Sequence, residues 1–272
     1  MKSCLFKVEG AGNDFLLGTG DWADRLAEDR ALVRRLCDRR RGVGADGILS
    51  INRQTSRSVA VVYVNADGSE GRFCGNGTRC AALAAVEVLG CNPQLDIATG
   101  WAVIPAEVRG AEVSLVLPAV EAAPQNTGIE SPGVVGAVLR LTVGVPHIVA
   151  RVTELAKLDL AVVAAPLRHH RAAGAEGANV NLYEIDDEGP VAIRTWERGV
   201  EAETLSCGSG SVAVALVVMA EHGSSRIVVR PASGDRLVVE ALGRAPVCAT
   251  RLTGPARIVA EIFPTAGFLA GR

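Results

Sequence analysis

The sequence contains two cysteines that each precede a glycine-rich turn and a run of small apolar residues. The first copy begins Cys74-Gly75-Asn76-Gly77 and the second begins Cys207-Gly208-Ser209-Gly210. In both copies a closing glycine lies 16 residues after the cysteine (90 − 74 and 223 − 207). The pattern predicts two matched helices, each with a thiol at its N-terminus.

A thiol at the start of a helix has an unusual environment. The first N–H groups of a helix lack internal partners and carry the positive end of the helix dipole. The glycines let the backbone approach a ligand without an intervening Cβ, so each helix start is suited to binding a carboxylate. The same environment favours thiolate over thiol and lowers the cysteine pKa from its usual value of about 8.5.

Two such sites predict a specific reaction. If one carboxylate is held between them, one thiolate can remove the proton from the adjacent carbon while the opposing thiol delivers a proton to the other face. Donors directed at the carboxylate would stabilise the charge that develops. This is racemisation or epimerisation without a cofactor, and neither half shows a lysine and phosphate-loop pattern for pyridoxal phosphate. The alternative, two ordinary buried cysteines, leaves the repeat unexplained.

The repeat continues beyond the cysteines. A strand, a glycine turn (Thr99-Gly100 or Ser233-Gly234) and a second strand follow each helix. Both helices are apolar on nearly every face and should therefore be buried. The expected fold is α/β (α+β), with two pseudo-symmetric domains, each a curved mixed or antiparallel sheet wrapped around a central apolar helix, and an active site in the cleft between them. We expect the domains to span residues 1–118 and 119–256, with 257–272 returning to the first.

Local patterns predict several further elements. A compact apolar run predicts a strand over 59–64, and glycine turns predict hairpins joining 101–108 to 112–117 and 226–230 to 236–240. Apolar residues at helical spacing predict one surface helix over 24–41.

Composition narrows the class of protein. The 272 residues are 49% hydrophobic but only 4% aromatic, so the core must consist of Val, Ala, Leu and Ile. The net charge of −2, without a basic run interleaved with aromatics, argues against a nucleic-acid partner. No apolar segment is long enough for a membrane span, and residues 1–14 lack a secretory core, so we expect a cytoplasmic protein.

The cysteines and histidines do not follow metal-site or disulfide patterns. Seven cysteines without a C-x-x-C pair are expected to be free thiols, and the four histidines are not at metal-ligand spacing from any cysteine. We therefore expect no metal. The sequence leaves the oligomeric state open, with a homodimer as one outcome.

One long segment resembles the signature of the diaminopimelate epimerases. It is Asn65-Ala66-Asp67-Gly68-Ser69-Glu70-Gly71-Arg72-Phe73-Cys74-Gly75-Asn76-Gly77-Thr78-Arg79-Cys80. Segments 10–15, 179–181 and 197–199 agree in the expected order, so the resemblance covers essentially the whole chain. It implies interconversion of LL- and meso-2,6-diaminopimelate, a step toward lysine and peptidoglycan, with Cys74 and Cys207 as the acid–base pair.

The resemblance also implies roles for other residues. The reacting centre's carboxylate would be bound by Gly75, Asn76, Gly208 and Ser209. The pocket and the substrate's distal end would be contacted by Asn13, Asn65, Asn179, Glu197 and Arg198. An Arg198 fork suits the distal carboxylate, and asparagine oxygens can accept from its ammonium. His147 and Glu197 would tune the thiol pKa values.

Three positions depart from the family pattern. Many members have Asn where this chain has Val145, and Gln where it has Gly47. The stretch Val200 to Thr204 is one residue longer than the common loop. These differences bear on substrate preference more than on reaction type.

Three alternatives remain open. The first is a racemase of another amino acid, such as histidine, on the same scaffold. The second is a thiol redox protein in which Cys74 and Cys207 form a disulfide. The third is a non-catalytic anion-binding module. Substrate screening and cysteine substitution discriminate among them.

Overall fold

The computed structural model describes residues 4–185, 189–243 and 246–270. The chain divides into two compact units, the first formed by residues 1–115 and 255–272 and the second by 116–254. Strands β8 and β17 each contain one of the two points of division.

The first unit is built around one mixed sheet. Its strands pair in the order β18–β1–β2–β3–β4–β6–β7–β8, and the short β5 pairs with β4. The strands are β1 (Leu5–Gly10), β2 (Asn13–Thr19), β3 (Gly47–Thr55), β4 (Ser58–Asn65), β5 (Glu70–Gly71), β6 (Gln94–Ala98), β7 (Val103–Arg109), β8 (Glu112–Glu121) and β18 (Arg257–Ile262). The helices are α1 (Asp21–Glu28), α2 (Arg30–Cys37), α3 (Gly75–Glu87) and α6 (Ala266–Leu269).

The second unit repeats this arrangement. Its strands pair in the order β9–β10–β11–β12–β13–β15–β16–β17, and the short β14 pairs with β13. The strands are β9 (Gln125–Asn126), β10 (Val134–Val143), β11 (Val145–Val152), β12 (Asn179–Glu184), β13 (Val191–Glu197), β14 (Ala202–Thr204), β15 (Arg226–Arg230), β16 (Leu237–Ala241) and β17 (Val247–Pro255). The helices are α4 (Leu160–Arg168) and α5 (Gly208–His222), with 3-10 turns at Leu155–Lys157 and Arg171–Ala173.

The two sheets share one pattern of strand directions. In each, successive pairings are antiparallel, antiparallel, parallel, antiparallel, parallel, antiparallel and antiparallel. In each, the second parallel connection carries the helix that follows a cysteine. The prediction of two pseudo-symmetric α/β halves is confirmed.

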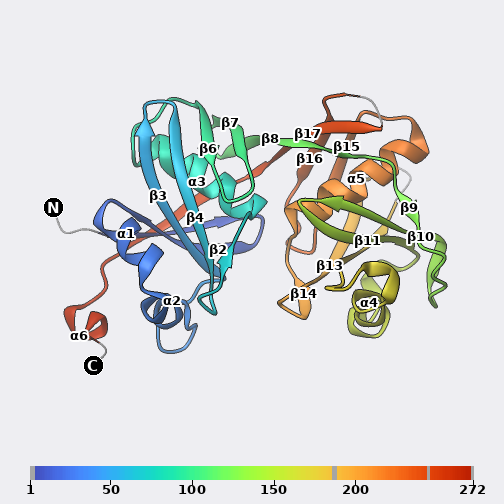
Figure 1. The fold of residues 1–272 in the computed structure, drawn as a ribbon, viewed down its shortest axis with the longest axis horizontal. Coiled ribbons are helices and arrows are strands. Elements are labelled where there is room, and N and C mark those ends of the chain that lie inside the picture. Colours follow the sequence, from blue (N-terminus) through green and yellow to red (C-terminus); the bar gives the residue numbers. More distant parts are fainter. Residues whose placement is uncertain (1–3, 186–188, 244–245, 271–272) are drawn as a thin grey trace. The chain divides into compact units, whose positions relative to one another are not determined.

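Helices α3 and α5 are the central helices of their sheets (Figure 1). Helix α3 packs against β1, β2, β3, β4, β6, β7 and β18, and α5 packs against β10, β11, β12, β13, β15 and β16. Every residue of α3 from Gly75 to Ala85 is buried, including Arg79, and most of these side chains are small. Helix α5 ends at Gly223, a C-cap with φ 67°, whereas α3 ends at Glu87, three residues before Gly90 (φ 64°).

The opposite face of each sheet has its own apolar core. In the first unit, Leu16, Ile48 and Val64 pack with Leu26 and Leu36 of α1 and α2. The predicted single helix over 24–41 is wrong, because Asp29 interrupts it. Its side chain accepts a hydrogen bond from Leu32 N at 2.8 Å and so begins a second helix, which ends at Cys37.

The predicted strand at 59–64 and both hairpins are confirmed. Strand β4 contains the predicted strand, and the β7–β8 and β15–β16 pairs form the two predicted hairpins. The hairpin turns contain Gly110 and Gly234, whose φ values are 60° and 82°. Turns with positive φ match the twist of antiparallel pairs and favour glycine.

Candidate active site

Cys74 is the N-terminal cap of α3. Its backbone is extended (φ −138°, ψ 113°), and its Sγ accepts a hydrogen bond from Gly77 N at 3.4 Å. The Cys74 carbonyl accepts from Thr78 Oγ1 at 2.8 Å. The sulfur therefore takes the position of a capping oxygen at the positive end of a buried helix.

Cys207 has the same geometry in the second unit. It caps α5 with φ −121° and ψ 111°, and its Sγ accepts from Gly210 N at 3.4 Å. Its carbonyl accepts from Ser211 Oγ at 3.0 Å. Ser209 Oγ lies 3.5 Å from the sulfur, and the residue Cys207 is only 7% exposed. The sequence repeat thus corresponds to a repeated thiol cap.

A tight hairpin brings Asn13 to the start of α3. Ala11 and Gly12 join β1 to β2 with φ values of 53° and 90°, which is the conformation of a two-residue turn. Asn13 follows this turn, and its Oδ1 accepts from Asn76 Nδ2 at 2.5 Å. Gly10 lies against the helix, where an added Cβ would be 3.1 Å from both the Asn76 carbonyl and Cys80 Sγ. Asn13, Asn76 and the Cys74 cap therefore form one cluster.

Asn65 is engaged in a turn at the end of β4. Its Nδ2 donates to Ser69 Oγ at 2.9 Å, and its backbone N–H donates to the Ser69 carbonyl at 2.8 Å. Asn65 pairs with Gly47 across the β3–β4 ladder. Its side chain thus closes the loop that leads to Cys74.

In the second unit, Asn179 lies between Cys207 and Arg198. Its Oδ1 accepts from the Arg198 backbone N–H at 2.8 Å, and its Nδ2 is 4.0 Å from Cys207 Sγ. Glu197 accepts from Thr204 Oγ1 at 2.8 Å. The structure thus brings Asn179, Arg198, Ser209 and Cys207 together.

His147 is a fully buried residue of β11. Its Nδ1 lies 3.1 Å from Asn181 Nδ2, which can only donate, so Nδ1 accepts and the ring proton is on Nε2. Burial lowers the pKa of His147 to about 3, and the charge of Arg198 adds to this effect while a hydrogen bond with the Val143 backbone opposes it. The imidazole is therefore neutral near pH 7 and contributes no positive charge to the thiols. The tuning role stays a prediction.

The buried His147 should make stability depend on pH. Its folded pKa of about 3 lies below the ordinary value of 6.5, so the unfolded chain binds the extra proton first as pH falls. We expect its contribution to be present above pH 6.5 and to be lost toward pH 3, at up to about 1.4 kcal/mol per pH unit. Urea unfolding of the wild type and His147→Gln at pH 7.5 and 5.0 measures the difference. Equal pH dependence in the two proteins would contradict the expectation.

Sequence reasoning missed three polar residues behind these clusters. Asn181 is fully buried, donates to the Ile148 carbonyl at 3.1 Å and accepts from Thr195 Oγ1 at 3.0 Å. In the first unit, Arg79 donates to Asn76 Oδ1 at 2.8 Å, and Asp46 accepts from Asn13 Nδ2 at 3.0 Å. The available signals were a polar residue between apolar strand neighbours and an arginine in an alanine-rich helix.

Two of the three departures from the family pattern, Gly47 and the longer 200–204 loop, have local explanations. An added Cβ at Gly47 would lie 2.6 Å from the Val64 carbonyl and 2.8 Å from Tyr63 Cε2, so the Tyr63 ring occupies that space. The longer loop contains Glu201, with φ 55°, whose carboxylate pairs with the buried Arg168 at 2.8 Å. Val145 begins β11 opposite Val143.

Within the described residues the cysteines form no disulfide, and their environments differ. Burial raises the pKa of Cys37 to about 12 and also raises that of Cys80, so both are protonated at neutral pH. Within the described ranges, no group of three or more His, Cys, Asp or Glu side chains is arranged to hold a metal. In the same part of the chain, every helix is too short or too polar to cross a membrane.

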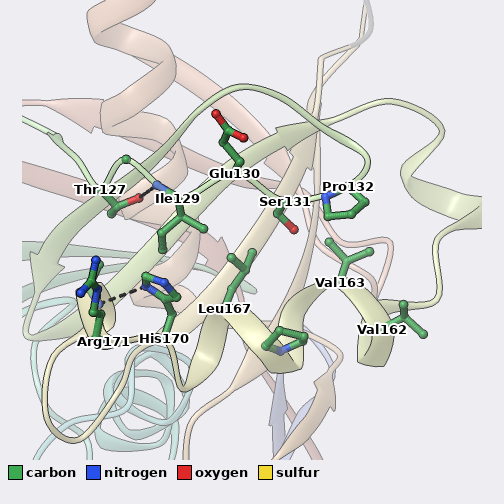
Figure 2. A pocket seen from close by; sticks show the side chains of 13 residues that line it. Thr127, Ile129, Glu130, Ser131, Pro132, Val162, Val163, Leu167, His170 and Arg171 are labelled. Atoms are coloured by element: carbon green, nitrogen blue, oxygen red, sulfur yellow. Dashed lines mark hydrogen bonds between the residues drawn. The ribbon is translucent and has the colours of Figure 1, made fainter.

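A separate cavity of about 410 Å³ lies in the second unit (Figure 2). It lies between the 127–132 loop and helix α4, with Leu167 and Val163 on one side and Ile129 on the other. Figure 2 shows His170 and Arg171 at one end. None of the predicted site residues lines this cavity.

A family profile and several curated relatives match most of this chain. The diaminopimelate epimerase family profile matches residues 5–113 and 140–259. The diaminopimelate epimerase of Chlorobaculum tepidum is 35% identical over 240 residues, covering 85% of this chain and 90% of that protein. That of Flavobacterium psychrophilum is 30% identical over 259 residues, covering 94% and 98%.

Solved structures show the same fold at low identity. A phenazine biosynthesis protein of the PhzF family from Enterococcus faecalis has a TM-score of 0.73 at 13% identity, covering 97% of this chain and 100% of that one. A hydroxyproline epimerase from Agrobacterium vitis has a TM-score of 0.62 at 16% identity, covering 96% and 91%. With family-wide sequence agreement and two thiol-capped central helices in one fold, this chain belongs to the diaminopimelate epimerase family.

Proposed function

We propose that this protein interconverts LL- and meso-2,6-diaminopimelate without a cofactor, with Cys74 and Cys207 as the two acid–base groups. The observation that carries the proposal is the matched pair of thiol caps, one in each unit, with Sγ 3.4 Å from the third helical N–H in both. The family membership supports the substrate. The proposal includes a cytoplasmic location.

The mechanism moves one proton off the α-carbon and another onto it. One cysteine, as thiolate, takes the α-proton and becomes a thiol. The other cysteine, as thiol, gives its proton to the opposite face and becomes a thiolate. The proposal therefore requires the two sulfurs to approach the α-carbon from opposite faces, and each turnover exchanges their protonation states.

The helix starts would make the proton acidic enough to remove. As the proton leaves, negative charge spreads onto the carboxylate. The first N–H groups of α3 and α5, at Gly75, Asn76, Gly208 and Ser209, would donate to its oxygens. Asn76 is only 1% exposed and its side chain is already bonded, so its contribution would come from the backbone.

The remaining site residues would bind the distal end of the substrate. Arg198 would form the bidentate pair with the distal carboxylate, and Asn179 would hold the Arg198 backbone in place. Asn13, Asn65 and Glu197 would line the pocket. Glu197 and His147 would adjust the thiol environment.

Arg198 already has a partner, which predicts a measurable effect on binding. Its Nη1 lies 2.8 Å from Glu176 Oε2, and the Glu176 side chain is 84% exposed. An exposed pair contributes about 1 kcal/mol or less, so removing it should lower KM by up to about fivefold while kcat stays unchanged. Steady-state kinetics of Glu176→Gln tests this, with Glu130→Gln as a surface control. An unchanged or higher KM would show that Glu176 does not compete with substrate.

The function is tested by proton exchange. Reduced protein is incubated with LL-diaminopimelate in heavy water, and the α-proton signal is followed by NMR. Deuterium at one α-carbon with conversion to the meso form is expected. If the free-thiol protein exchanges histidine or another simple amino acid instead, the substrate is wrong. If it exchanges none, the reaction type is wrong.

A further inference from the structure

A directional chain of hydrogen bonds runs through the first unit behind Cys74. Arg79 Nη2 donates to Asn76 Oδ1 at 2.8 Å, and Asn76 Nδ2 donates to Asn13 Oδ1 at 2.5 Å. Asn13 Nδ2 then donates to Asp46 Oδ2 at 3.0 Å. A guanidinium can only donate and a carboxylate can only accept, so the two charged ends determine which way each amide faces.

Arg79 is placed where its charge is costly. The residue is 0% exposed, in an otherwise small and apolar helix, and its Nε donates to the Pro255 carbonyl at 3.2 Å. A buried cation is strongly unfavourable unless its surroundings compensate it, and an apolar side chain would fill the space more favourably. An apolar replacement would reproduce neither this bond to the Pro255 carbonyl nor the bond to Asn76, and only the second bond connects Arg79 to the site.

Asp46 holds the other end firmly. Its Oδ1 pairs with Arg39 Nη2 at 2.6 Å, and its Oδ2 also accepts from the Asp14 backbone N–H at 3.3 Å. Arg39 in turn pairs with Asp14 at 2.7 Å. Because Asp46 is itself held from two sides, Asn13 cannot turn its amide without placing two oxygens against each other.

We propose that Arg79 and Asp46 are positioning residues that orient the amides of Asn76 and Asn13. The side-chain carbonyl of Asn76 then faces Arg79, and that of Asn13 faces Asn76. The second N–H of the Asn13 amide is the group left to contact substrate. Given the proposed function, Asn13 recognises a carboxylate oxygen of the amino acid and not its ammonium.

Reversing the chain tests this. In Asn76→Asp, the introduced carboxylate still accepts from Arg79 but cannot donate to Asn13, so two oxygens meet and stability should fall. Adding Asp46→Asn supplies a donor at the far end, which lets Asn13 turn over and bond on both sides. The double variant has the same formal charge as the wild type.

We expect the double variant to be more stable than the sum of the single effects predicts. Its kcat/KM should nonetheless stay roughly tenfold to hundredfold below wild type, because a reversed Asn13 presents oxygen to a carboxylate. Asp46→Asn alone measures the loss of the carboxylate charge that pairs with Arg39, together with the loss of the acceptor for the Asp14 N–H.

Two results would overturn the proposal. Additive stability losses in the urea-unfolding cycle would show that the chain does not set the amide directions, and this reading does not depend on activity. Activity recovering together with stability would show that the Asn13 orientation is irrelevant to substrate. If wild type ignores diaminopimelate, the proposed function fails while the unfolding cycle still decides the orientation.

Discussion

Replacing Cys74 or Cys207 with serine is expected to reduce epimerisation by roughly 10²–10⁴-fold, because a hydroxyl cannot serve as the base at neutral pH. Each variant keeps one of the two proposed acid–base thiols. It should therefore exchange the α-proton of only one epimer with solvent, without inversion. The two variants should therefore act on opposite epimers. NMR in heavy water, with LL- and meso-diaminopimelate supplied separately, measures both properties.

The chain provides matched controls for this experiment. Cys91 in the first unit donates to the Thr55 carbonyl at 3.8 Å, and Cys248 in the second donates to the Ala249 carbonyl at 3.0 Å. Serine at either position should leave turnover within about twofold of wild type, since surrounding bonds are retained. If both active-site variants exchanged the same epimer, the sulfurs would not address opposite faces.

Gly210→Ala is expected to disrupt the second thiol cap, whereas the equivalent Gly77→Ala should be tolerated. An added Cβ at Gly210 would lie 2.1 Å from Asn181 Oδ1. Asn181 cannot retreat without breaking its bonds to Ile148 and Thr195. We expect a loss of about 2–4 kcal/mol in the free energy of unfolding, together with most activity.

At Gly77 the nearest atom to an added Cβ is Leu49 Cδ2 at 3.0 Å, the end of a flexible side chain. Alanine also favours helix over glycine by about 0.5–1 kcal/mol, so this variant should be near neutral. Urea unfolding and steady-state turnover of the two variants give the comparison. Equal losses at both positions would mean that the Asn181 contact is not what makes Gly210 necessary.

Most of the fold could be predicted from the sequence, because its main elements have local signals. Helices α3 and α5 are apolar on nearly every face, strands alternate with glycine turns, and both signals are local. The break at Asp29 was missed because helical spacing continued across it, and only the bond to Leu32 N shows that the side chain begins a new helix.

The residues that hydrogen-bond to the predicted site residues were harder to predict from the sequence. The cysteines and glycines have a sequence signature, but Asp46 lies 33 residues from Asn13, and Thr195 lies 14 from Asn181. Such bonds depend on strand register, which a single sequence does not reveal. The neutral state of His147 likewise follows from burial by distant strands.

The shared order of strand directions has a consequence for the history of this protein. A chain of about half this length, with one thiol and one carboxylate-binding helix start, would have needed a second identical copy to invert a stereocentre. Fusion of two copies would have removed that dependence and allowed the sequences of the two halves to diverge. The present halves differ in just this way: the polar Asn181 lies beside Gly210 in one, whereas the apolar Leu49 lies beside the equivalent Gly77 in the other. Duplication thus offers a route from a symmetric ancestor to an enzyme that tells the two ends of its substrate apart.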